Sequence, residues 1–318
     1  MKRGFLRTPT RLDGGRKRTP VYSNPSGHSA HVAQPTGGIA GVYPTNRLAM
    51  LRRMSGDAAP PSAPVALVTT EIRHPATDSL TESSSKELKR LLFEYLPIER
   101  HAQDMAWAMG AGGSPTPTPE RFVRYVNRDN TLAASMKTQA LVIETTAYTS
   151  FESLVDVMMG VMDARSQVSS IVGVERIGLR YVLEVRVPVG ADGGIEWADW
   201  IAEPLLGPRH IAPGGLTLTE WQGAAVYREA QPGKSMIVRY GPSLGQALDP
   251  SYHLRRTMPV QPGPFFLLDI DSFWTPAGAI PEYNRDAVLG TFQNLYEPAR
   301  TVFQEMLIGR PQDDLLRS

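Results

Sequence analysis

The stretch that decides the fold is Gly173–Pro188, GVERIGLRYVLEVRVP. Its apolar residues alternate with Arg180, Glu184 and Arg186, and a period of two indicates a β-strand with one apolar face and one charged face. The last five residues, EVRVP, resemble EIRHP at 71–75. This similarity predicts a chain built from two related halves, with the quoted strand opening the second half.

The first half is predicted to have the order β-α-β-β-β-α. Each predicted helix follows a serine or threonine with a glutamate three residues later, the capping box that marks a helix start: Ser79 with Glu82, and Thr149 with Glu152. The segment 110–119 is rich in glycine and proline and is interpreted as a loop. The predicted strands are 65–73, 121–128, 131–137 and 139–146, and the predicted helices are 80–96 and 151–165.

The second half is predicted to repeat that order. The tetrapeptide FLLD at 266–269 precedes its last helix, and LVIE at 141–144 precedes the last helix of the first half. The similarity is therefore present at both ends of each unit. The predicted strands are 177–187, 216–227, 235–240 and 265–272, and the predicted helices are 197–206 and 285–308.

Helices with one apolar stripe and strands with one apolar face indicate the α+β class. We expect the duplicated units, 63–172 and 173–310, to share one curved, mainly antiparallel sheet with the helices on one face, as in saddle or helix-grip architectures. The residues 311–318 are interpreted as a tail. The polar segment 241–264 is interpreted as a disordered insertion or as a partner-binding loop, because loops of this length are usually one or the other.

Residues 1–62 differ in composition from the rest. Residues 1–60 carry ten basic and two acidic side chains, whereas the other residues carry 23 basic and 30 acidic ones. The segment is rich in proline and glycine, which predicts a disordered basic arm able to bind nucleic acid. The alternative is an over-extended N-terminus, with translation starting at Met50 or Met54 and not at Met1.

The composition excludes several classes of protein. There is no cysteine, which excludes disulfides, thiolate metal sites and thiol nucleophiles. No apolar run is long enough to span a bilayer and no signal peptide is recognisable, so a cytoplasmic protein without membrane contact is expected. No HExxH, Walker or GxGxxG motif is present, and neither a catalytic residue nor a cofactor is indicated. His74 and His210, each near a proline, are interpreted as surface residues.

The charged face of the predicted sheet holds the candidate binding residues. Asp269 and Asp271 lie two residues apart on one strand, so their side chains point the same way. Such a pair can hold Mg²⁺ or Mn²⁺, with Glu144 or Glu184 as a further ligand. The alternative is ordinary ion pairing across the strands. The candidate binding residues are Glu71, Arg73, Arg180, Glu184, Arg186, Asp269 and Asp271.

Three short segments carry a family resemblance. EIR at 71–73, IGLRY at 177–181 and LDID at 268–271, before a long C-terminal helix, resemble a sporadically distributed prokaryotic family of uncharacterised proteins. The resemblance covers about residues 65–308. Leu183 stands where the family often has asparagine. The patchy distribution implies a mobile-element, toxin–antitoxin or phage-defence context.

The function predicted from the sequence is a non-enzymatic binding or regulatory one. The missing catalytic motifs and the two-fold architecture favour it, with a protein partner or a second copy of the chain as the bound species. The alternative is a metal-dependent hydrolase or nuclease that uses the carboxylates of Asp269 and Asp271.

Overall fold

The computed structural model describes residues 65–109, 115–190, 194–211, 213–216, 218–229 and 233–307. The chain divides into two units, Met1–Met54 and Ser55–Ser318, and every described residue belongs to the second. The predicted basic arm at 1–62 and the predicted tail at 311–318 lie outside the described residues.

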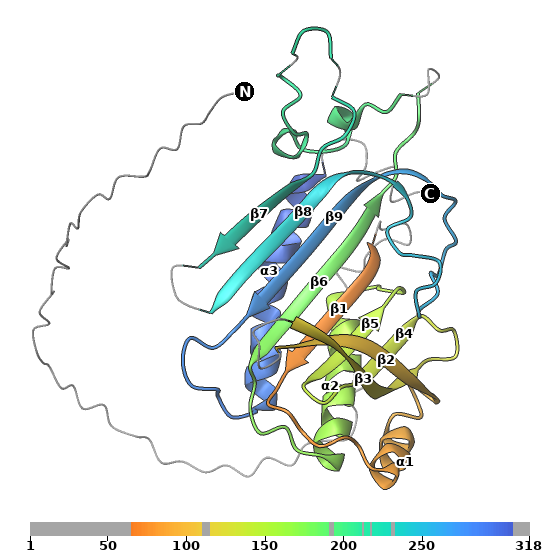
Figure 1. The fold of residues 1–318 in the computed structure, drawn as a ribbon, viewed down its shortest axis with the longest axis vertical. Helices are drawn as coiled ribbons and strands as arrows, with labels where there is room; N and C mark the ends of the chain where they lie inside the picture. The colour runs from red at the N-terminus through yellow and green to blue at the C-terminus, as the bar shows by residue number, and fades with distance from the viewer. Residues whose placement is uncertain are drawn as a thin grey trace, which may run out of the picture. The chain divides into compact units, whose positions relative to one another are not determined.

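Nine strands form one open, antiparallel sheet in the order β2-β3-β4-β5-β1-β6-β9-β8-β7 (Figure 1). Three α-helices accompany it, so the α+β prediction is confirmed. The strands are β1 Val65–Arg73, β2 Ile98–Met109, β3 Pro115–Val126, β4 Leu132–Met136, β5 Ala140–Thr145, β6 Arg176–Val185, β7 Gly223–Arg228, β8 Lys234–Gly245 and β9 Gly263–Trp274.

The strands β1 and β6 meet in the middle of the sheet, and the order of the other strands is symmetrical about them except for the extra strand β2. Glu71 lies opposite Val142, and Glu184 lies opposite Leu267. Val142 and Leu267 are the second residues of the similar tetrapeptides LVIE and FLLD. In each half, the first similar segment therefore pairs with the second in the same register, as a duplication requires. The duplication itself stays a prediction.

The helices α2 and α3 lie on the same side of the sheet (Figure 1). The helix α3 contacts β6 and β9, and α2 contacts both α1 and α3. One continuous core lies between them, in which Leu88, Met158 and Phe292 meet Leu179 and Ile270 of the sheet. None of the described helices is long and apolar enough to cross a membrane. The bounds are α1 Glu82–Leu91, α2 Phe151–Val168 and α3 Arg285–Met306.

The strand β2 was not predicted, so the first half has the order β-α-β-β-β-β-α. It forms a long hairpin with β3, which begins at Pro115 and not at Arg121. Polar residues such as Glu99, Arg100 and His101 give its sequence no period of two, since an edge strand need not bury one face. The loop predicted at 110–119 is therefore shorter, and only its residues 110–114 lie outside the described part of the chain.

The predicted capping residues, Ser79 and Thr149, lie two residues and one residue too early, although the second helix begins at 151 as predicted. Thr81 caps α1 by accepting from the Ser84 N–H, and Ser150 caps α2 by accepting from the Ser153 N–H. In both cases the hydroxyl nearest the first turn takes the capping role from the predicted residue.

The second half also departs from its predicted elements. The helix predicted at 197–206 is two short 3₁₀ turns, Trp197–Asp199 and Glu203–Leu205, because a proline in the second turn lacks the N–H that a longer helix needs. The strand predicted at 216–227 is shorter in the structure, where β7 covers only Gly223–Arg228. The strand β8 runs five residues beyond its predicted end, to Gly245.

The connection between β8 and β9, residues 246–262, packs on the sheet face opposite the helices. Leu248 and Leu254 are buried there against Ala66, Leu67 and Val182 in a second, smaller core. The interpretation of this segment as a disordered insertion is therefore wrong. We call residues 246–262 the docked loop.

Candidate functional site

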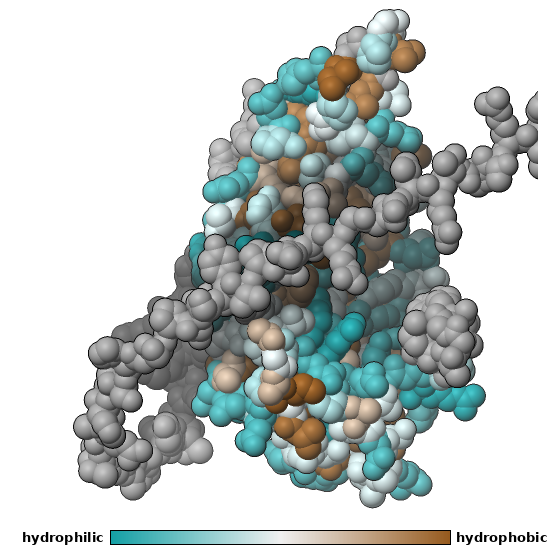
Figure 2. Space-filling model, turned by 60° about the vertical axis from the view of Figure 1, so that its left-hand side comes forward, coloured by the Kyte–Doolittle hydropathy of each residue, from teal (hydrophilic) through white to brown (hydrophobic). Residues whose placement is uncertain are grey.

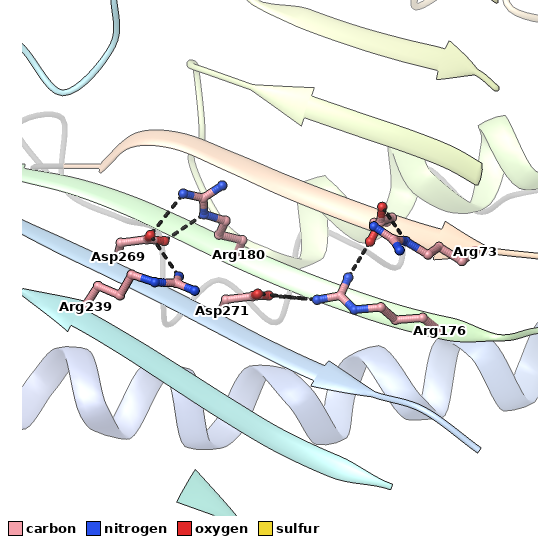
Figure 3. A network of polar contacts seen from close by, with 7 residues as sticks. Arg73, Arg176, Arg180, Arg239, Asp269 and Asp271 are labelled. Atoms are coloured by element: carbon pink, nitrogen blue, oxygen red, sulfur yellow. Dashed lines mark hydrogen bonds and ion pairs between the residues drawn. The ribbon is translucent and has the colours of Figure 1, made fainter. Parts of the chain in front are cut away.

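The charged side chains of the central strands lie on the sheet face that points away from α3 (Figure 3). They come from four neighbouring strands, β1, β6, β9 and β8, because alternate residues of each strand point to the same face. We call this surface the arginine face. Its members are Glu71, Arg73, Arg176, Arg180, Arg239, Asp269 and Asp271.

Asp269 is held between two arginines. Its carboxylate accepts from Arg180 Nε at 2.7 Å and Nη2 at 2.9 Å, a bidentate pair, and from Arg239 Nη1 at 3.3 Å. The Asp269 side chain is only 6% exposed, whereas both arginine side chains are 48% exposed. The carboxylate raises the pKa of Arg180 above its ordinary value. The charge that this cluster presents to solvent is therefore positive.

Asp271 belongs to a second chain of ion pairs. Arg176 Nη2 lies 3.1 Å from Asp271 Oδ1, and the other Arg176 nitrogen, Nη1, binds Glu71. Glu71 also accepts from Arg73 Nε at 3.0 Å. Arg176 was missed because the predicted strand began at Ile177, although residue 176 is in the same alternation as Arg180.

Glu184 and Arg186 are not part of the arginine face. The docked loop covers them: the Glu184 carboxylate accepts from Arg186 Nε at 2.6 Å, from the Ala247 N–H at 2.8 Å and from Arg256. Burial alone would raise the pKa of Glu184, but the hydrogen bonds from Ala247, Arg186 and Arg256 outweigh it and hold the pKa below its ordinary value. The seven predicted binding residues therefore form two separate groups.

Glu144 anchors the middle of the docked loop. Its carboxylate binds the Tyr252 hydroxyl, and His253 Nε2 lies 2.9 Å from Glu144 Oε2. Burial opposes the charge of Glu144, but these two partners lower its pKa from the ordinary value. Glu144 and Glu184 are thus occupied by the docked loop.

The carboxylates proposed as metal ligands are bound by guanidinium groups. Asp269 is bound by Arg180 and Arg239, and Asp271 by Arg176. Among the described residues, no three carboxylate or imidazole side chains gather in a way that would hold a metal ion. The geometry favours ion pairing across the strands at these positions.

His74 is buried and not at the surface, with 1% of its area exposed. Its Nδ1 lies 2.9 Å from the Pro75 carbonyl, and its Nε2 has no hydrogen-bond partner. It follows Arg73 at the end of β1, so the alternation turns it to the helix side of the sheet. His210 is at the surface, as predicted, 2.9 Å from Glu203.

The strand β7 ends the sheet beside the arginine face. Its residues Val226 and Tyr227 are 51% and 49% exposed. The Glu229 N–H bonds the Lys234 carbonyl of β8 at 3.2 Å. Because the bonds of an antiparallel pair alternate, the N–H and C=O groups of residues 224, 226 and 228 point outward, away from β8.

The outward-pointing residues of β7 also have their side chains on the arginine face. Ala224 lies opposite Arg239, and Val226 lies opposite Ile237. Figure 2 turns this side of the sheet forward and shows small hydrophobic patches among hydrophilic residues. Sequence reasoning placed a strand here but missed its edge position, which depends on the long-range order of the sheet.

The comparisons with known proteins give no relative from which a role can be carried over. No family model matches the chain, and no curated protein matches it. The functional argument therefore depends on the geometry of the arginine face and of β7.

Proposed function

We propose that the chain is a non-enzymatic binding protein that takes up an extended, acidic segment of a partner protein along β7. The observation that carries the proposal is the position of β7, a strand at the end of the sheet whose outer row of donors and acceptors lies next to exposed arginines. An added strand pairs with such an edge through main-chain hydrogen bonds, and its alternate side chains provide specificity.

The charge of the arginine face favours an acidic partner. Its four arginines accompany three carboxylates, and Arg228 of β7, in the same alternation as Ala224 and Val226, adds a further cation beside it. A side chain of an added strand opposite Ala224 would extend over that small residue toward Arg239 on β8. A glutamate in the partner therefore has a cation within its reach.

A second copy of the chain is a less suitable occupant. If two β7 strands paired about Val226, Arg228 of each would lie opposite Ala224 of the other and beside the other's Arg239. Like charges placed opposite each other destabilise a strand pair. The metal-dependent alternative has no geometric support, since Asp269 and Asp271 are both bound by arginines.

The test uses the full chain and two synthetic eight-residue peptides, one alternating glutamate with valine and one alternating lysine with valine. We expect the acidic peptide to bind and the basic one not to bind. Val226→Pro removes one outward N–H while the N–H groups that bond β8 remain, so it should weaken binding about tenfold, whereas Val226→Ala should change it little. Loss of one arginine in Arg239→Met should weaken binding about two- to fivefold. Equal affinity for both peptides would contradict the proposal.

A further inference from the structure

A cavity of about 700 Å³ lies between α1, the β2–β3 hairpin and α2. All of its lining residues belong to the first half of the chain, whereas β7 belongs to the second. Its walls come from the segment before α1, from β2 and β3, and from the residues that follow β4. A volume of this order is typical of sites for small molecules.

Arg165 of α2 lines this cavity. It is 1% exposed, and it is the only buried arginine or lysine among the residues that the structure describes. Its guanidinium donates from Nη1 to the Ser169 carbonyl and from Nη2 to Thr77 Oγ1 at 3.3 Å. Both partners are uncharged, and no described carboxylate forms an ion pair with Arg165.

A buried charge without a counter-ion is costly, so proteins ordinarily pair it. Buried carboxylates elsewhere in the molecule do have counter-ions. Asp269 and Glu184 are each bound by two arginines, whereas Arg165 has no carboxylate partner among the described residues. Burial lowers the pKa of Arg165 from its ordinary value, but a guanidinium stays charged at neutral pH. Two of its five N–H groups are used, which leaves donors for a further acceptor.

The other walls of the cavity carry charges of both signs. Lys137 lines the cavity and lies 2.5 Å from Asp104 and 5.0 Å from the centre of the Phe122 ring. Thr138 is fixed by Glu120 through its hydroxyl at 2.8 Å and its N–H at 3.1 Å. Three carboxylates line the cavity: Asp78 and Glu82 are exposed to solvent, whereas the Glu99 side chain is 22% exposed and lies 3.6 Å from Lys89 Nζ.

We propose that this cavity binds a small molecule through an oxyanion group, a carboxylate or a phosphate, which becomes the counter-ion of Arg165. The site is separate from the edge of β7, so the proposal does not depend on the proposed function. A guanidinium fork matches both oxyanions, and bidentate binding gives such pairs their strength and geometry.

The first test is an NMR titration of the full chain with inorganic phosphate and, separately, acetate, with sodium chloride keeping the ionic strength constant. We expect saturable shifts of the amides of Thr77, Ser85 and Thr138 with at least one anion. The anion that binds more tightly identifies the group. Shifts only at exposed arginines such as Arg180, or no saturation with either anion, would overturn the proposal.

The second test uses thermal unfolding, because a ligand that binds only the folded state raises Tm. Arg165→Met should abolish the rise in Tm with anion, and Arg165→Lys should weaken the apparent affinity about tenfold, or ~1.4 kcal/mol. Arg285→Met, which removes an arginine of α3 outside the cavity, should keep the wild-type response. An unchanged response in Arg165→Met would overturn the proposal. If that variant does not fold, the NMR titration of the wild type decides.

Discussion

His74 is a buried imidazole whose environment lowers its pKa. The largest cause is burial, to which the charge of Arg165 adds, while the Pro75 carbonyl and Glu175 act in the opposite direction. In the unfolded chain a histidine binds its proton near pH 6.5. Below that pH the unfolded state therefore binds more protons than the folded state, and the free energy of unfolding falls as the pH decreases.

This difference predicts a pH dependence that belongs to His74. We expect urea unfolding to show a loss of stability between about pH 7.5 and 5.5, and a smaller loss in His74→Leu. His101→Gln, a change at an exposed histidine, should keep the wild-type loss. Identical pH dependence of the wild type and His74→Leu would contradict the assignment.

Arg176 and Arg73 both bind Glu71, but only Arg176 is largely covered: their side chains are 19% and 57% exposed. Arg176 also binds Asp271. We expect Arg176→Met to lower the free energy of unfolding by about 1.5–3 kcal/mol, because it removes hydrogen bonds to two carboxylates. Arg73→Met should cost less than about 1 kcal/mol. Chemical unfolding of the two variants measures the difference, and equal losses would contradict the different roles given to them.

At the residue level, the sequence predicted which charged residues share one face of the sheet but not which of them form ion pairs. The period of two placed Arg180, Asp269 and Asp271 on one face, which the structure confirms. Which arginine meets which carboxylate depends on register: Arg180 lies opposite Asp271 yet binds Asp269 on the diagonal. Register is set by long-range strand pairing, which no local pattern contains.

The docked loop is an element whose role the sequence left open. It is fastened by two carboxylates of the sheet, since Glu184 binds Ala247 and Arg256 and Glu144 binds Tyr252 and His253 near its middle, and also by the buried Leu248 and Leu254. Its polar composition resembled a mobile insertion because Leu248 and Leu254 are its only buried apolar side chains. The anchoring carboxylates lie far away in the sequence, so composition alone could not identify them.

Leu254→Ala should open the docked loop without unfolding the sheet. Removing a buried leucine side chain costs about 2–5 kcal/mol, and the loss here falls on a segment that packs by itself on one face. Hydrogen exchange should increase in residues 246–262 and change little in β1 and β6. Met258→Ala is the control, since Met258 is 58% exposed in the same loop. Equal acceleration throughout the sheet would contradict local opening.

Among the strands, the alternation of apolar and polar residues predicted the bounds most accurately where one face of the strand is buried. The prediction for β1, Val65–Arg73, agrees with the structure at both ends, because its alternation is strong and its apolar face is covered. The side chains of β2 at 98–104 are half-buried or exposed, and β7 is exposed along most of its length. The strand β2 and the edge position of β7 therefore became visible only in the assembled sheet.

The part of the molecule that the structure describes is one sheet with two different faces and with β2 and β7 at its two edges. The helices and the main core cover one face, the docked loop covers part of the other, and the arginine face remains beside β7. Sequence reasoning predicted the class and a sheet with the helices on one face. It did not predict the edge that now carries the proposed function, since edges are a property of the complete strand order.

The most direct measurement of the central claim is residue-resolved hydrogen exchange across β7, with and without the peptide that alternates glutamate and valine. In the free protein the amides of Ala225 and Tyr227 should be protected and those of Ala224 and Val226 should exchange quickly, because they alternate between bonding β8 and pointing outward. Saturating peptide should protect Ala224 and Val226 and leave the other two unchanged. Bound peptide with continued fast exchange at Ala224 and Val226 would contradict binding as an added strand.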